Sequence, residues 1–139
     1  MLHAALAGET RAHMLNPPAA LFSARSLHAD VAKIAAQGYG PDWNPPPADG
    51  GVLAVLDLAR WCVASTSNFR DGALRAVNLG GDSDVIAAVY GQLAGAHYGV
   101  SMIPSSWRHA LARADLISEL SDRLLRNALV RVGEQAPGP

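Results

Sequence analysis

Residues 78–98 read NLGGDSDVIAAVYGQLAGAHY, a polar turn rich in glycine followed by a long uncharged run. We expect a helix from about Val85 to Tyr98 over this run. Its alanines and glycines form a face of small side chains, so the backbone of a neighbouring helix can approach closely. A helix with so little polar surface is expected to be buried in protein.

The remainder of the chain carries further helix signals and no strand signal. Apolar residues recur at helical spacing over residues 2–15, and the two prolines that follow Asn16 end that run. No segment shows the sustained alternation of apolar and polar residues that a half-buried strand would show. The expected fold is therefore all-α and compact. Its other predicted helices span residues 20–37, 52–64, 69–77 and 115–132, with a short one that begins at Pro104.

Chain length and loop composition favour one domain. The chain has 139 residues, which is the size of an ordinary single domain. We expect a single helical domain over residues 1–132. Within it, residues 38–51 form a surface loop rich in proline and glycine, and residues 133–139 follow it as a disordered tail.

The composition argues against several classes of function. The formal net charge is −1, so the chain lacks the basic field that binding to nucleic acid or to an anionic membrane requires. Cys62 is the single cysteine, which leaves no intrachain disulfide and no cysteine-based zinc site. The first residues carry no signal-peptide core, and the longest uncharged stretch is too weakly apolar for a membrane span. We therefore expect a soluble protein of the cytoplasm.

The helix predicted over residues 52–64 is apolar nearly all round, interrupted only by Asp57 and Arg60. These two residues lie at i and i+3, so we expect them to pair with each other. Cys62 on the same helix is expected to be an inert core thiol. Trp43, in the loop before this helix, has two open interpretations: it stacks on an adenine, or it anchors the loop, which is the more common use.

One segment combines glycine with closely spaced acids. Gly80 and Gly81 precede Asp82, Ser83 and Asp84 at the mouth of an expected helix. Two carboxylates at this spacing suit a hard cation such as Mg²⁺, and the glycines let a ligand approach the backbone. The start of a helix also favours acidic residues for capping, and on spacing alone capping is the favoured interpretation.

A longer pattern surrounds these acids. It reads AVNLGGDSD at residues 76–84 and continues as GQLAGAHYG at residues 91–99. In this pattern the chain resembles the ADP-ribosylglycohydrolase family. The resemblance covers most of the chain and extends to AALAG at residues 4–8, Trp61, FRDGAL at residues 69–74, AAV at residues 87–89, Ile103-Pro104, Trp107 and the last helix.

The resemblance implies that this chain is the C-terminal portion of an all-α fold with a binuclear magnesium site. In that family the site grips ADP-ribose and hydrolyses its bond to a modified side chain. The implied partners are thus ADP-ribose or an ADP-ribosylated protein. By position, Asp82 and Asp84 are the implied metal ligands, while the glycines beside them shape the backbone. The implied ligand-binding residues are Asn78, Gly80, Gly81 and Ser83.

Two departures from the family pattern bear on catalysis. Val85 stands where the family has a threonine or serine whose hydroxyl also ligates metal. The family's other acidic ligands, a Thr-Asp-Asp cluster and an early Gly-Asp motif, have no counterpart in residues 1–75. Two carboxylates preorganise few of the ligands of Mg²⁺, so we expect at most one weakly held ion and impaired catalysis.

Three classes of function follow from this sequence. The first is a hydrolase of ADP-ribosyl bonds and the second a non-catalytic ADP-ribose-binding module. The third is an interaction fragment that dimerises or that pairs with a separately encoded N-terminal half. Loss of half of a helical domain exposes apolar faces, above all on the helix over residues 52–64. A homodimer is the simplest way to cover such a face.

Overall fold

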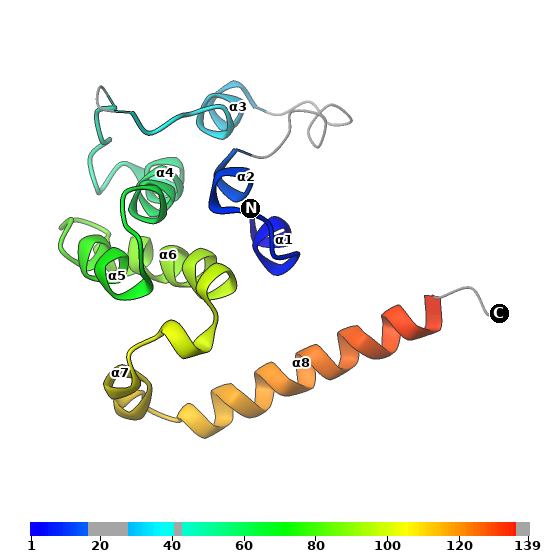
Figure 1. Ribbon diagram of the computed structural model, residues 1–139. Coiled ribbons are helices and arrows are strands. Elements are labelled where there is room, and N and C mark those ends of the chain that lie inside the picture. Colours follow the sequence, from blue (N-terminus) through cyan, green and yellow to red (C-terminus); the bar gives the residue numbers. More distant parts are fainter. Residues whose placement is uncertain (17–27, 41–42, 136–139) are drawn as a thin grey trace. The chain divides into compact units, whose positions relative to one another are not determined.

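The computed structural model describes residues 1–16, 28–40 and 43–135. Within these ranges every regular element is a helix, which confirms the predicted all-α fold. The chain divides into two compact units, Met1–Ile103 and Pro104–Pro139. The helices of the first unit, drawn in Figure 1, are α1 (Leu2–Leu6), α2 (Arg11–Leu15), α3 (Ala29–Ala35), α4 (Gly51–Ala64), α5 (Phe69–Val77), α6 (Ser83–Tyr98) and the 3-10 helix η2 (Val100–Met102).

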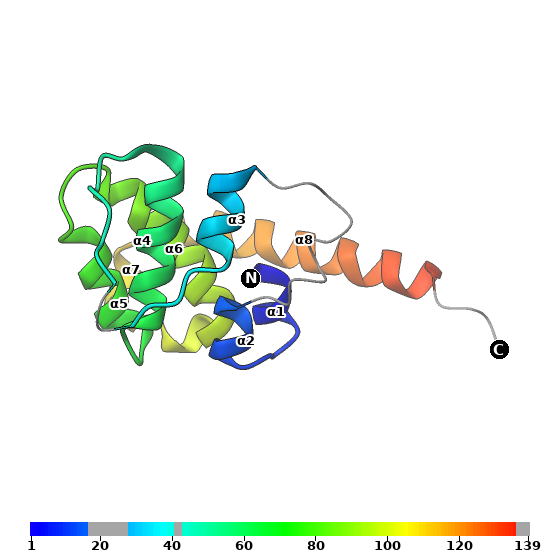
Figure 2. The same ribbon diagram turned by 90° about the horizontal axis from the view of Figure 1, so that it is seen from above.

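Helix α6 is the central element of the first unit, since α1, α4 and α5 all pack against it (Figures 1 and 2). The expected close approach at its glycines is not found: a β-carbon on Gly91 or Gly95 would meet no heavy atom within 4 Å in the described part of the chain. The close approach occurs instead on α5, where Gly72 lies against the ring of Tyr90. The side chains that α6 buries are Ile86, Tyr90, Leu93 and Ala94.

Helix α4 is the most deeply buried element, with eight of its 14 residues buried. Its packing against α5, α6 and the shorter α2 and α3 covers nearly all of its surface. The expectation that this helix exposes an apolar face is therefore wrong, apart from Val52 in its first turn, which is 81% exposed. Burial of this many apolar side chains makes α4 a major contributor to the hydrophobic core.

The predicted pair of Asp57 and Arg60 is wrong, because each side chain has partners elsewhere. Asp57 accepts a hydrogen bond from the hydroxyl of Tyr39, with 2.7 Å between Oη and Oδ1. The guanidinium of Arg60 donates to the carbonyl oxygens of Leu15, at 2.6 Å, and Ile34. Both residues are buried, so they take the polar partners that the neighbouring segments bring to them. Arg60 thereby ties α2 and α3 to α4.

The single helix predicted over residues 2–15 is in fact two short helices. Gly8 has a φ of +73°, a left-handed conformation that breaks the helix. Thr10 then caps α2 by accepting a hydrogen bond from the His13 amide at 3.3 Å. The helix predicted over residues 20–37 falls partly outside the described residues, and its described part forms α3. Residues 38–40 and 43–50, which belong to the predicted loop, contain no helix.

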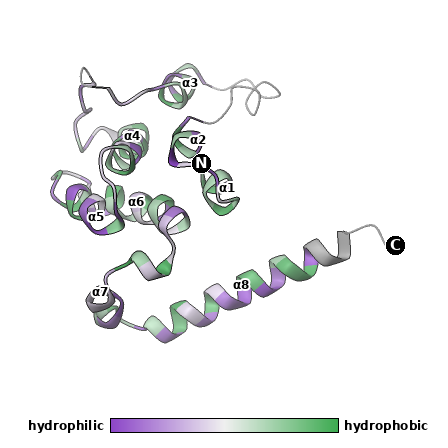
Figure 3. Cartoon of the chain, viewed as in Figure 1, coloured by the Kyte–Doolittle hydropathy of each residue, from purple (hydrophilic) through white to green (hydrophobic). Residues whose placement is uncertain are grey.

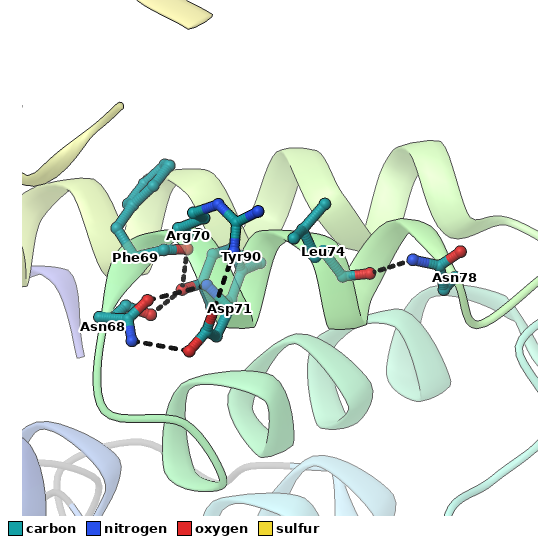
Figure 4. A network of polar contacts seen from close by, with 7 residues as sticks. All are labelled: Asn68, Phe69, Arg70, Asp71, Leu74, Asn78 and Tyr90. Atoms are coloured by element: carbon teal, nitrogen blue, oxygen red, sulfur yellow. Dashed lines mark hydrogen bonds and ion pairs between the residues drawn. The ribbon is translucent and has the colours of Figure 1, made fainter. Parts of the chain in front are cut away.

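Helix α5 begins and ends where the sequence predicts, and Figure 4 shows why it begins there. The side chain of Asn68 accepts a hydrogen bond from the Asp71 amide at 2.9 Å and donates one to the Asp71 carboxylate at 2.8 Å. These two hydrogen bonds between Asn68 and Asp71 cap the first turn of the helix. The hydroxyl of Tyr90 donates to the Phe69 carbonyl at 2.9 Å and so joins α6 to the same turn.

The second unit contains α7 (Ser105–Ala110) and α8 (Ala114–Gln135). Helix α7 follows Pro104 as predicted, and α8 ends at residue 135 where the sequence predicts an end at 132. Apolar and charged residues both occur along the part of α8 that is coloured in Figure 3. No helix in the described ranges is long and apolar enough to cross a membrane. The large apolar side chains of α8 that are exposed are Leu116, Ile117, Leu120, Leu124, Leu125, Leu129 and Val130.

Candidate functional site

The segment between α5 and α6 turns sharply at two glycines. Gly80 has a φ of +76° and Gly81 a φ of +50°, a left-handed region that other residues rarely adopt. At Gly81 there is a second constraint, since a β-carbon would lie 2.9 Å from the carbonyl carbon of Ala48. The glycines are therefore required by the backbone of this turn and by the loop that lies against it.

Asp82 occupies the N-cap position of α6 without capping it through its side chain. Its backbone carbonyl accepts the first helical hydrogen bond, from the Ile86 amide at 3.0 Å, and its own amide donates to the Ala48 carbonyl at 3.2 Å. Asp84 lies in the first turn of the same helix. The capping interpretation thus predicts the position of Asp82 correctly but not the hydrogen bond that would occupy its carboxylate.

Both carboxylates are exposed, and within the described ranges neither has a hydrogen-bond or ion-pair partner. They lie near the positive end of the α6 dipole, which favours negative charge there. Free carboxylates at a helix start are available to a cation or to hydrogen-bond donors of a ligand.

The remaining predicted site residues lie in or beside the same turn. Asn78 turns back toward α5 and donates from Nδ2 to the Leu74 carbonyl at 2.6 Å, as Figure 4 shows. It therefore fixes the end of α5, from which the glycine turn departs. Ser83 is half-buried as the first residue of α6, and Gly80 is exposed. These residues are neighbours because they are close in sequence.

A cavity of about 430 Å³ opens beside Asp82. Its walls are apolar, and of the described residues that line it Asp82 alone is charged. The residues on the α4 side of this cavity were not predicted from the sequence. A usable signal is the second glycine pair: Gly50 and Gly51 lie at the start of α4, as Gly80 and Gly81 lie shortly before the start of α6. Gly51 also has a positive φ of +80°. The lining residues are Gly51, Val52, Val55, Leu56, Asp82, Val85 and Val89.

The donor set at this turn fits a Mg²⁺ ion held by one or two carboxylates. Such an ion would take its other ligands from water and from the phosphate oxygens of a ligand. It does not fit a closed site made by protein alone: in the part of the chain that the structure describes, no three His, Cys, Asp or Glu side chains are grouped closely enough to hold a metal. Val85, which is 48% exposed beside the two acids, offers no oxygen ligand.

Trp43 anchors the loop that precedes α4. Its ring stacks on that of Trp61, with 5.3 Å between the centroids and 28° between the planes. The ring of Tyr39 meets Trp43 edge-on at 5.1 Å. The two rings leave Trp43 half-buried, so of its two sequence interpretations the structure supports the anchor.

Cys62 lies in the core, as predicted. It is fully buried in α4, and this burial raises the pKa of the thiol to about 11. The positive charge of Arg75 acts in the opposite direction but does not outweigh the burial. A thiol that stays protonated at neutral pH is a poor nucleophile.

Comparisons with known proteins agree with the resemblance seen in the sequence. The ADP-ribosylglycohydrolase family model matches residues 1–133. An ADP-ribosylarginine hydrolase of Pseudomonas putida is 37% identical over 128 residues, which is 91% of this chain and 33% of that protein. A second one, from Serratia proteamaculans, is 46% identical over 77 residues, 55% of this chain and 21% of the relative.

A further relative is the ADP-ribosyl-[dinitrogen reductase] glycohydrolase of Rhodospirillum rubrum. It is 42% identical over 65 residues, which is 47% of this chain and 21% of that protein. The chain thus spans between a fifth and a third of the length of these curated relatives. No solved structure matches the chain significantly.

Proposed function

This chain belongs to the ADP-ribosylglycohydrolase family, and from that premise we propose that it binds ADP-ribose and hydrolyses ADP-ribosyl–protein bonds with the help of magnesium. The observation that carries the proposal is the turn of residues 80–84. There, two carboxylates without partners in the described part of the chain lie at the start of α6, and one of them lines an apolar cavity.

The turn and its cavity offer two kinds of contact to an ADP-ribosyl group: apolar walls for its flat ring, and two carboxylates that can hold a cation for its diphosphate. The valines that line the cavity suit a flat ring, because such a ring gains free energy when its apolar surface leaves water. A diphosphate, by contrast, is repelled by Asp82 and Asp84 unless a cation lies between them. The two acids therefore support a ligand that arrives with Mg²⁺ and not one that binds alone.

Asp82 and Asp84 are the residues that would hold the ion. Once bound, Mg²⁺ supplies a Lewis acid that polarises a ligand oxygen and lowers the pKa of a coordinated water. The chain's own contribution is positional. Gly80 and Gly81 bring the backbone close to the ligand, and Asn78 fixes the point at which the turn leaves α5.

The first test is calorimetric titration of ADP-ribose into the protein, with Mg²⁺ and again with EDTA. Asp82→Asn and Asp84→Asn remove one charge each and keep the shape of the side chain. We expect binding in Mg²⁺, loss of binding in EDTA, and a dissociation constant raised about tenfold or more in each variant, which corresponds to about 1.4 kcal/mol. Asp122→Asn, an exposed acid of α8, is the matched control and should bind as the wild type does.

Hydrolysis is tested separately, by release of ADP-ribose from a protein modified on arginine. The names of two relatives specify ADP-ribosylarginine as their substrate, so we propose this bond first for the present chain. Release that depends on Mg²⁺ and is lost in Asp82→Asn supports the hydrolase. Unchanged binding and release in both site variants would show that the site assignment is wrong.

The second candidate function is a non-catalytic ADP-ribose-binding module. Val85 favours it, since an apolar side chain stands beside the two acids and leaves the metal with two protein ligands within the described ranges. Binding of ADP-ribose that persists in EDTA, without release from a modified protein, would support this candidate over the hydrolase.

We further propose that the chain forms a homodimer through α8. Seven large apolar side chains are exposed on this helix, a surface that a second copy would remove from water. Charge indicates the orientation: the first half of α8 is net acidic and the second half net basic, so two antiparallel copies place opposite net charges side by side. The first half, residues 114–124, carries Asp115, Glu119, Asp122 and Arg123, and the second half, residues 125–135, carries Arg126, Arg131 and Glu134.

A further inference from the structure

We propose that Trp43 is a positioning residue for the ligand site at Asp82. It holds the loop of residues 43–50 in place, and this loop in turn holds the backbone of the glycine turn. The inference rests on the proposed function for its consequence in ligand binding. The structural link between Trp43 and Asp82 can be measured without any ligand.

The anchor of the loop is a stack of aromatic rings on α4. Trp43 lies on Trp61, and the Arg75 guanidinium of α5 lies over the Trp61 ring, 5.0 Å from its centroid. Tyr39 meets Trp43 from the edge and donates its hydroxyl hydrogen to the buried Asp57 of α4. Stacked rings and a cation over a ring both stabilise this arrangement, so together they fix the start of the loop.

The segment between the anchor and the site is short and stiff. Pro45, Pro46 and Pro47 follow Trp43 and Asn44, and each proline fixes its own φ. The Gly50 amide donates to the Pro47 carbonyl at 3.1 Å and closes a turn directly before α4. With few free dihedral angles in between, a displacement of Trp43 is passed on to Ala48.

Ala48 makes the contact with the glycine turn. Its carbonyl accepts the hydrogen bond from the Asp82 amide at 3.2 Å. The backbone of Gly81 lies so close that an added β-carbon would be 3.0 Å from the Asp49 amide nitrogen. The loop therefore fixes the backbone position of Asp82 at the N-terminus of α6. It thereby also limits where the Asp82 carboxylate lies at the cavity.

The experiment compares Trp43→Ala with Trp107→Ala, a matched loss of a tryptophan in the second unit. Amide hydrogen exchange is followed by NMR in the full chain without ligand. We expect the Asp82 amide to exchange about tenfold faster in Trp43→Ala, because its acceptor is released, with buried amides of α4 unchanged. Trp107→Ala should leave the Asp82 amide as in the wild type, and Trp43→Phe, which retains a stacking ring, should restore most of its protection.

A second variant tests the same structural link at the glycine turn. Gly81→Ala forces a β-carbon against Ala48, so we expect the same fast exchange at Asp82 while the near-ultraviolet circular dichroism of the Trp43–Trp61 pair persists. Unchanged Asp82 exchange in Trp43→Ala, with the stacking signal lost, would overturn the proposal.

Titration with Mg²⁺ and ADP-ribose then separates the two proposals. If the positioning role is correct and the site binds, Trp43→Ala weakens binding by about tenfold, or about 1.4 kcal/mol, without a matching loss in Trp107→Ala. A wild type that binds neither probe contradicts the proposed function alone, since the exchange result stands by itself. Faster exchange at Asp82 with unchanged binding would overturn the role of Trp43 in the ligand site.

Discussion

Gly72 on α5 lies directly against the side chain of Tyr90 on α6. A β-carbon placed on Gly72 would be 2.6 Å from the ring carbon Cε2, closer than real β-carbons approach other atoms. Tyr90 is fully buried, and its hydroxyl is held by the Phe69 carbonyl at 2.9 Å, so the ring has no room to withdraw. This contact sets the distance between the helices on either side of the glycine turn.

Gly72→Ala is therefore expected to destabilise the first unit by about 1–3 kcal/mol, the usual cost of overpacking a core. Urea unfolding measures the change. Gly91→Ala is the matched control: it is helical, has no neighbour within 4 Å in the described part of the chain, and should be neutral or slightly stabilising. Equal stability of the two variants would show that the contact between α5 and α6 is looser than described.

Tyr39→Phe should destabilise the protein by about 1–3 kcal/mol, because it removes the hydrogen-bond donor of the buried Asp57 carboxylate. Tyr98→Phe is the control for loss of a phenolic hydroxyl. The Tyr98 hydroxyl is buried without a partner in the described ranges, so its removal should cost little or even stabilise. Thermal unfolding compares the two variants, and a larger loss in Tyr98→Phe than in Tyr39→Phe would contradict this assignment.

These partners of Asp57 and Arg60 show what the sequence could not predict. The pairing rule for residues three apart on a helix considers a single helix in water. Here Tyr39, Ile34 and Leu15 reach the two side chains from 18, 26 and 45 residues away in the sequence. Partners that arrive through tertiary packing leave no local pattern.

Features that depend on neighbouring residues were predictable. The bounds of α5 follow from Asn68, whose capping hydrogen bonds involve residues of the same turn. Asp82 and Asp84 could be placed at the start of α6 for the same reason, because the pattern that locates them is local. Gly8 shows the limit of local patterns, because apolar residues continue at helical spacing on both sides of it while its φ of +73° divides the run.

The candidate site was predicted in part. Residues 78–84 are contiguous and carry the family pattern, so the sequence was sufficient to find them. The wall supplied by α4 and the contact of Ala48 with Asp82 join segments about 30 residues apart, and no spacing rule predicts such a contact.

Stability should fall as the pH rises above about 9, and Cys62 should contribute to this fall. Burial raises the pKa of its thiol from 9.0 to about 11, so between these values the folded chain keeps a proton that the unfolded chain loses. The unfolded state binds fewer protons there, and the free energy of unfolding therefore decreases with pH. Burial also raises the pKa of Tyr39 and of Tyr90, which act in the same direction at higher pH.

Cys62→Ala should make this decrease less steep between pH 9 and 11, which urea unfolding at a series of pH values measures. The same thiol should resist iodoacetamide in the native protein at pH 8 and react once the chain unfolds. Rapid labelling of the native protein, or an unchanged pH slope in Cys62→Ala, would contradict the burial argument.

The proposed dimer depends on α8, so a charge placed on its apolar face should separate the copies. Leu124 is 72% exposed, and Leu124→Glu would bury an unpaired carboxylate in the interface, which should raise the dissociation constant about tenfold or more. Val100→Glu is the matched control, since Val100 is 67% exposed and lies outside α8.

Sedimentation velocity over a range of concentrations measures the association. Because the two halves of α8 carry opposite net charge, added salt should weaken the antiparallel pair. A wild type that sediments as a monomer at every concentration would exclude this interface, and equal dissociation of the two variants would place the dimer contact elsewhere.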